Sequence, residues 1–283
     1  YIVTIFCFGT LIHIAIEKIF QATGNMILPM VFLCIGAITN IILDPIMIFG
    51  LLGFPRLEVA GAAIATVIGQ IAAMLTAVIV FLTKEHEVRP KWRGFRFHWK
   101  TIKEIYAVGI PTMLMNSLSS VLITGLNGIL MTFSQTAVSV FGVYFKLQSF
   151  VFMPTSGLTQ GAMPIMGYNY GAKNKMRLMD TLKWSCIISF LIMAAGCLLF
   201  ELFPAQLLRM FNASGDMLGI GVRALSIISI SYLGAAFGFV FSTLFQAVGK
   251  GFYSLCVSLL RQLILILPVS YVLSKLIGLD VVW

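Results

Sequence analysis

Long apolar runs separated by short polar connections make up most of this chain. Eight of them are long enough to be helices, near residues 1–20, 28–50, 58–82, 104–131, 137–165, 180–203, 217–245 and 252–277. At 1.5 Å per residue, each run can cross the roughly 30 Å of hydrocarbon in a bilayer. The pattern therefore predicts an all-α polytopic membrane protein with eight transmembrane helices.

Composition supports this interpretation. Hydrophobic residues make up 59% of the 283 residues, charged residues make up 10%, and the mean hydropathy is +1.00. These values exceed what a water-soluble core of this length requires. The five cysteines stand apart, without the spacing of a metal site or a disulfide framework. The sequence opens and closes in or beside an apolar run, so we expect an internal fragment of a longer protein.

The net charge of +9 is concentrated in two connections. Basic residues crowd residues 84–103, after the third run, and residues 173–183, after the fifth. The positive-inside rule places both on the cytoplasmic side. The first basic group is interleaved with four aromatic residues, Trp92, Phe95, Phe97 and Trp99. Proteins that stack nucleobases on aromatic side chains show the same combination. In so apolar a chain, a segment lying on anionic lipid headgroups is favoured, and we expect no nucleic-acid partner.

One short motif occurs twice. Residues 20–25 read FQATGN and residues 245–250 read FQAVGK, with four of six positions identical at an offset of 225. The same offset pairs Gly9 with Gly234. Both copies follow runs that are expected to point inward, so the pattern predicts two lobes built from parallel internal repeats. Residues 84–103, the longest hydrophilic segment, are then the linker between the lobes.

Asp44 is the one carboxylate deep within an apolar run. A charged Asp at mid-bilayer depth costs about 2.5 to 3.5 kcal/mol, so it is interpreted first as a functional residue. Asn40 lies one helical turn earlier on the same face. Pro45 has no backbone N–H, so we expect a kink and a free carbonyl beside the carboxylate. These groups suit a proton or a small hard cation; the alternative is an Asp that caps a broken helix or bonds a neighbouring one.

Pairs of glycines four residues apart favour close contact between membrane helices. Such pairs occur at Gly157 and Gly161, Gly167 and Gly171, Gly215 and Gly219, and Gly234 and Gly238. The spacing allows neighbouring helices to approach closely at these positions, but glycine is common in membrane helices, so each pair alone predicts no contact.

Several segments, in order, resemble the multidrug and toxic compound extrusion (MATE) transporters of prokaryotes. Residues 21–25, 40–50 and 61–66 resemble their fourth to sixth helices, and residues 109–112, 145–148 and 164–172 resemble the seventh and eighth helices and the loop that follows. The resemblance implies a fragment similar to helices four to eleven of a twelve-helix, two-lobe protein. Residues 1–83 are then three helices forming the second half of the first lobe. Residues 84–103 are a basic cytoplasmic linker, and residues 104–283 are five helices of a second lobe that lacks its last helix.

The resemblance also assigns roles to residues. Asn40 and Asp44 match the family's N-x-x-x-D motif on the fifth helix, and Thr66 matches a threonine on the sixth, so these three are expected to form the cation-coupling site. Another Asp of that site belongs to the family's first helix, which has no counterpart here. The second-lobe runs that carry acidic residues in some members hold no carboxylate at depth. Candidate substrate-cavity residues are Asn116, Lys146 and Gln148.

The expected function is a cation-coupled antiporter, driven by H+ or Na+, which exports amphipathic, cationic drugs or toxic organic compounds by alternating access. It is expected to be a monomer in a bacterial-like plasma membrane, with lipid and small organic substrates as partners and no cofactor or metal besides the coupling ion. The sequence contains no H-E-x-x-H or G-x-S-x-G motif, so we do not expect an enzyme. The alternatives are a flippase for a lipid-linked precursor and a non-transporting membrane scaffold.

Overall fold

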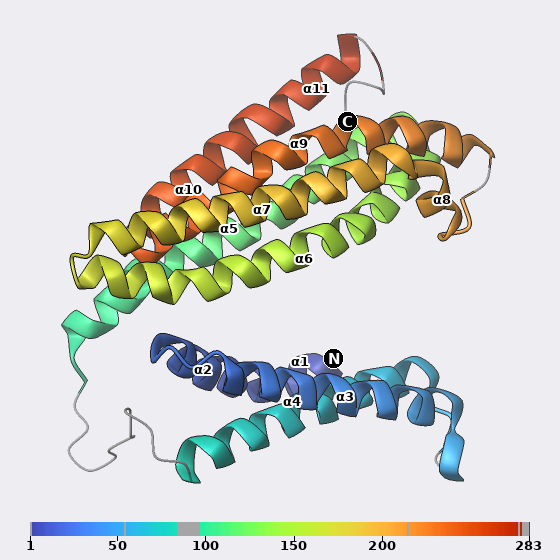
Figure 1. Cartoon of the computed structure of the whole chain (residues 1–283). Helices are drawn as coiled ribbons and strands as arrows, with labels where there is room; N and C mark the ends of the chain where they lie inside the picture. The colour runs from blue at the N-terminus through green and yellow to red at the C-terminus, as the bar shows by residue number, and fades with distance from the viewer. Residues whose placement is uncertain (1, 54, 84–96, 214, 277, 279–282) are drawn as a thin grey trace. The chain divides into compact units, whose positions relative to one another are not determined.

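The chain divides into two compact units, Tyr1–Arg96 and Phe97–Trp283 (Figure 1). The computed structural model describes residues 2–53, 55–83, 97–213, 215–276, 278 and 283. The division falls within the expected linker, of which residues 84–96 lie outside the described residues. Residues 99–103 belong to a helix instead, because the chain from Trp99 to Val108 contains no Gly or Pro that would stop one.

The first unit contains three substantial helices (Figure 1). Its elements are α1 (Ile2–Ile5), α2 (Phe8–Ala22), α3 (Ile27–Phe49), a 3-10 turn (Leu51–Gly53) and α4 (Glu58–Thr83). Helix α4 packs along α3 and also contacts α2. Ile16, Phe20, Phe32 and Ala77 form a buried core at one end of this packing.

The second unit contains five long helical segments and one short helix (Figure 1). Its elements are α5 (Trp99–Met131), α6 (Gln135–Gly171), α7 (Lys175–Leu202), α8 (Pro204–Arg209), α9 (Gly215–Ala247), α10 (Gly251–Leu259), a π-helical segment (Leu260–Ile266) and α11 (Leu267–Leu276). Helices α6, α7 and α9 pack on one another, and α10 and α11 pack on α5. Leu130, Met193 and Tyr232 are fully buried at the centre of the larger core.

The expectation of an all-α polytopic membrane protein is confirmed. Seven helices among the described residues are long and apolar enough to cross a membrane, and no strand occurs there. Eight were expected. The first expected span is divided by a turn at Phe6 and Cys7, which leaves α2 with 15 residues. The division follows four consecutive β-branched residues, Ile2–Ile5, which lower helix propensity.

Most of the regularly spaced glycine pairs do not lie at a close helix contact. A Cβ atom added to Gly157, Gly161, Gly171, Gly215, Gly219 or Gly234 would meet no atom within 4 Å. Close backbone approaches occur instead between α3 and α4, at Gly36 with Gly69 and at Met47 with Gly61. Gly69 belongs to a stripe of small buried residues on α4, namely Gly61, Ala65, Gly69, Ala73 and Ala77. Spacing by four marks one face of a helix, but the partner opposite that face decides whether backbones meet.

The repeated sequence motif forms the same turn in both units. Helices α2 and α9 each end at a glycine with positive φ, +84° at Gly24 and +75° at Gly249. The residue after each glycine donates its N–H back to a phenylalanine carbonyl, at 3.0 Å from Asn25 and 2.8 Å from Lys250. This is the Schellman arrangement, in which glycine avoids the steric cost of a left-handed conformation. The internal repeat therefore has a structural counterpart.

Candidate functional site

Helix α3 places Asn40 and Asp44 one turn apart on the same face. The amide Nδ2 of Asn40 donates to the carboxylate Oδ1 of Asp44 at 3.2 Å, and both side chains are half-buried. The helix continues through Pro45 to Phe49. Because Pro45 has no N–H, the carbonyl of Ile41 loses its helical donor close to the carboxylate.

Helix α4 supplies Thr66 from the other side. The same Nδ2 of Asn40 lies 3.5 Å from Thr66 Oγ, at the long end of hydrogen-bond geometry. The Thr66 hydroxyl donates to the carbonyl of Ala62 at 2.8 Å, so its lone pairs are directed away from its own helix. Asn40 therefore bridges a carboxylate on α3 and a hydroxyl oxygen on α4, the arrangement expected from the sequence.

A close crossing of the two helices sets this geometry. A Cβ on Gly69 would lie 2.7 Å from the carbonyl oxygen of Gly36 and 3.3 Å from the Cβ of Asn40. A Cβ on Gly61 would likewise collide with the backbone carbonyl of Met47, nearer the start of α4. Only glycine allows backbones to approach this closely. Thr66 lies three residues before Gly69, so the crossing brings its hydroxyl beside Asn40.

The Asp44 carboxylate has no ion-pair partner in the part of the chain that the structure describes. The two salt bridges found there join Lys18 to Glu17 at 3.9 Å and Arg56 to Glu58 at 3.4 Å. Asp44 is bonded instead to a neutral amide. An unneutralised carboxylate in an apolar helix is costly, and binding a proton or a metal cation removes that cost.

The structure does not join the three expected cavity residues into one group. Asn116 is exposed on α5, Lys146 is exposed on α6, and Gln148 is half-buried. Lys146 and Gln148 are two positions apart and therefore point to different sides of α6. The Nζ atom of Lys146 lies 5.9 Å from the centre of the Phe211 ring, a cation-π contact. Their role in a cavity stays a prediction.

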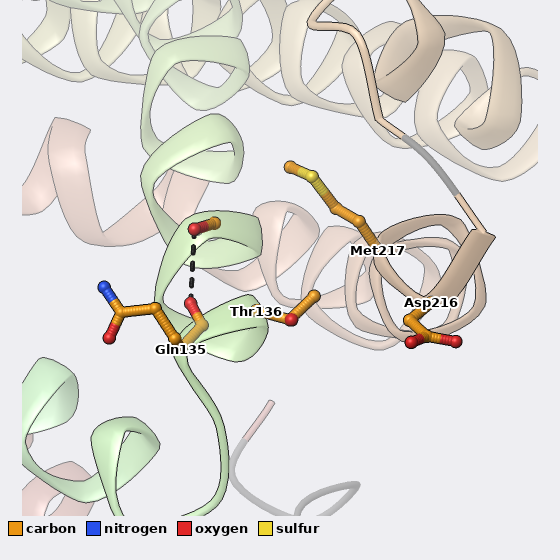
Figure 2. A pocket seen from close by; sticks show the side chains of 5 residues that line it. Gln135, Thr136, Asp216 and Met217 are labelled. Atoms are coloured by element: carbon orange, nitrogen blue, oxygen red, sulfur yellow. Dashed lines mark hydrogen bonds between the residues drawn. The ribbon is translucent and has the colours of Figure 1, made fainter.

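A separate open pocket of about 280 Å³ lies where α6 and α9 begin. It is lined by Gln135, Thr136, Ser139, Asp216 and Met217, as Figure 2 shows. The Ser139 hydroxyl donates to the carbonyl of Gln135 at 3.2 Å, the bond drawn in Figure 2. None of the six candidate residues lines this pocket, so it is not the predicted site.

Sequence reasoning missed two buried ionisable residues. His13 and Glu17 on α2 are 6% and 7% exposed. The repeated glutamine, Gln21 in the first unit and Gln246 in the second, could have drawn attention to this turn of the helix. In both units it donates a hydrogen bond to the side chain four residues earlier, which is Glu17 in the first unit.

Comparison with known proteins matches residues 111–272 to the MatE family model. The multidrug export protein MepA of Staphylococcus haemolyticus is 30% identical over 275 residues, covering 96% of this chain and 59% of MepA. MepA of Staphylococcus saprophyticus is 30% identical over 270 residues, covering 95% of this chain and 58% of that protein. The chain thus spans less than two thirds of the length of these relatives.

Solved structures agree along the whole chain. A crystal structure of MATE in the bent conformation has a TM-score of 0.90 and 26% identity, covering 100% of this chain and 62% of that one. A MOP superfamily transporter from Pyrococcus furiosus, for which a reversed polarity of the binding pocket suggests a different function, has the same TM-score and identity. That match covers 97% of this chain and 62% of the other. The chain therefore belongs to the MatE family of multidrug and toxic compound extrusion proteins.

Proposed function

We propose that this chain carries the coupling-ion site of a cation-driven antiporter that exports amphipathic, cationic organic compounds from a bacterial cell. The observation that carries the proposal is the Asn40–Asp44–Thr66 group, which joins a carboxylate, an amide and a hydroxyl across α3 and α4. Two relatives that match 95% and 96% of the chain are named multidrug export proteins. Their names support drug efflux as the activity.

Coupling follows from the cost of an unpaired carboxylate in a membrane. Asp44 binds H+ or Na+ from the outer side, where the ion is driven inward, and releases it to the cytoplasm in the other conformation. If the substrate is neutral, one elementary charge moving through 100 mV provides about 2.3 kcal/mol, which sustains roughly a fifty-fold substrate gradient. A monovalent cation exchanged one for one moves no net charge, so its export is driven by the ion concentration gradient, about 1.4 kcal/mol per tenfold. Alternating access converts this energy into export when the occupied and empty carboxylate favour different conformations.

The proposed substrate class rests on side chains that adapt to varied apolar ligands. The chain has 15 Met and 23 Phe. Thioethers are flexible and polarisable, and aromatic faces attract cations. Asn116 and Gln148 are proposed as polar contacts in the cavity, where each supplies a hydrogen-bonding amide. Lys146 is proposed to line it beside Phe211.

A flippase for a lipid-linked precursor is the second candidate, because the Pyrococcus furiosus relative is described with a pocket of reversed polarity. Such a substrate carries phosphate, which favours several cavity cations. Lys146 and Arg261 are the candidates. Lys146 already contacts an aromatic ring, and the Arg261 guanidinium packs 3.6 Å from the place a Cβ on Gly238 would occupy. Two candidate cations are few for a phosphate-bearing substrate, so the antiporter is favoured.

The deciding experiment is dye efflux from vesicles that contain the protein in its membrane, with an imposed pH or Na+ gradient. Asp44→Asn preserves shape but cannot exchange a proton or bind a cation as a carboxylate does, so we expect gradient-driven efflux to be lost. The matched control is Glu58→Gln, which makes the same chemical change at an exposed position of the same unit and should leave efflux intact. Wild-type efflux by well-inserted Asp44→Asn protein would contradict the proposal.

A further inference from the structure

Helix α2 carries two buried ionisable side chains that the Asp44 site does not use. His13 and Glu17 are 6% and 7% exposed, and they lie one turn apart on the face that packs against α3 and α4. The His13 ring is edge-on to Phe32 of α3, with ring centroids 6.3 Å apart. Its Nε2 atom is buried and has no hydrogen-bond partner among the described residues.

Glu17 is connected to the polar end of α2 by a short chain of contacts. Gln21 Nε2 donates to Glu17 Oε1 at 2.6 Å, and Lys18 Nζ donates to Gln21 Oε1 at 2.9 Å. The Lys18 side chain is 52% exposed, whereas that of Glu17 is 10% exposed. The carboxylate is therefore buried but lies within two hydrogen bonds of a solvated group.

The second unit shows that this turn does not require a carboxylate. At the offset of 225, Gln246 corresponds to Gln21, and its Nε2 donates at 3.3 Å to the hydroxyl of Ser242, the counterpart of Glu17. Ser242 is itself hydrogen-bonded to Ser254 of α10. The counterpart of His13 is Gly238. The same helix end and the same hydrogen bond from the glutamine amide thus form with neutral groups in the second unit, so neither requires an ionisable side chain.

The surrounding charges keep this pair separate from the Asp44 site. On α3, Asp44 lies twelve residues beyond Phe32, about 18 Å along the helix axis. On α4, Glu58 lies nineteen residues before Ala77, which packs in the same core as Phe32, a rise of about 28 Å. The exposed thiol of Cys34 is the other titratable group on α3, and α1 has none. Among the described residues of the first unit, Lys18 is the charged side chain nearest to Glu17.

We propose that Glu17 and His13 form a second proton-binding site in the first unit, distinct from the Asn40–Asp44–Thr66 group. The pair holds one exchangeable proton that enters from the Lys18 end of α2. The Glu17 carboxylate takes the proton and becomes a neutral carboxylic acid one helical turn from the His13 imidazole. The buried pair then carries one negative charge less than when the proton is absent.

Infrared difference spectroscopy of the purified protein in lipid vesicles tests this proposal without any transport step. Between about pH 8 and pH 5, the wild type should gain the C=O band of a protonated, slowly exchanging carboxylic acid. The band should disappear in Glu17→Gln and in Glu17→Ser, which copies the second unit. It should persist in Glu58→Gln, where the carboxylate removed is exposed. Asp44→Asn should leave the Glu17 band in place, so failure of the Asp44 mechanism and failure of this one are distinguishable.

The His13→Gln variant tests whether His13 and Glu17 titrate as a pair or whether Glu17 binds its proton alone. Coupled groups titrate together, so removing the imidazole should move the pH midpoint of the Glu17 band by about one pH unit or more. Circular dichroism and thermal unfolding check that each variant is folded. The proposal is overturned if folded Glu17→Gln retains every wild-type carboxylic acid band, or if His13→Gln leaves the midpoint of the Glu17 band unchanged.

Discussion

The hydroxyl of Thr66 lies 3.5 Å from the amide nitrogen of Asn40, although 26 residues separate them in the sequence. The same nitrogen lies 3.2 Å from the carboxylate of Asp44. Asn40 therefore contacts both Asp44 on its own helix and Thr66 on the neighbouring helix. In the proposed mechanism, a cation bound at Asp44 would also contact the Asn40 side chain, which would link ion binding to the contact between α3 and α4.

Asn40→Ala should weaken coupling without abolishing it. In the proposed mechanism, the substitution removes the amide oxygen that would bind Na+ or accept a hydrogen bond from the protonated acid, a contact worth about 1.5 kcal/mol, and it leaves the carboxylate in place. We expect about a tenfold higher coupling-ion concentration for half-maximal efflux. Efflux measured against a series of pH or Na+ gradients checks this, and a loss as complete as that of Asp44→Asn would show that Asn40 is indispensable.

The coupling ion should stabilise the folded protein through Asp44. An ion that binds the native state at a hundred times its dissociation constant adds about 2.7 kcal/mol of stability. Thermal unfolding in detergent should therefore shift upward with Na+ if Na+ is the coupling ion, and should be insensitive to Na+ if the ion is H+. The shift should vanish in Asp44→Asn and remain in Glu58→Gln; an equal shift in Asp44→Asn would place the bound ion elsewhere.

Gly69→Ala should destabilise the first unit. The added Cβ would lie 2.7 Å from the backbone oxygen of Gly36, and backbone cannot rotate away, so α3 and α4 must separate at an expected cost of about 1 to 3 kcal/mol. Gly157→Ala on α6 is the matched control. A Cβ there meets no atom within 4 Å, and Ala is a better helix former than Gly by about 1 kcal/mol.

Thermal unfolding compares the two glycine variants, and efflux adds a second measure. Gly69→Ala should also reduce coupled efflux, because separating the helices carries Thr66 away from Asn40. Equal stability of the two variants would mean that the crossing at Gly36 and Gly69 is looser than the structure shows.

Replacing Gly249, in the turn after α9, should cost less stability with Asn than with Ala. This residue has a φ of +75°, a conformation that costs most L residues about 1 to 2 kcal/mol. Asn adopts the left-handed region more readily than Ala, so Gly249→Asn should lose less stability than Gly249→Ala. The same order is expected at Gly24, where φ is +84°. The reverse order in thermal unfolding would mean that the turn rearranges.

The candidate site shows which part of its geometry can be predicted from the sequence: the pairing of Asn40 with Asp44 can, and the distance to Thr66 cannot. The i, i+4 spacing of Asn40 and Asp44 already implies one helical face, because helix geometry is local. Thr66 was added by family resemblance, and its distance from Asn40 depends on a crossing that no local pattern reveals. The repeated Phe-Gln-Ala-x-Gly motif likewise predicted matching helix ends, since a Schellman turn is set by a few adjacent residues.

By itself, the sequence determined the helical class, the membrane setting, the repeat and the pairing of Asn40 with Asp44, all of which follow from composition and short-range periodicity. The tertiary structure decided which glycines touch, selecting Gly36 and Gly69 over the regularly spaced pairs of α6 and α9. It also decided that Glu17 is buried despite the adjacent Lys18. Burial and backbone contact depend on the surface of another helix, and a side chain's own neighbours in sequence carry no information about that surface.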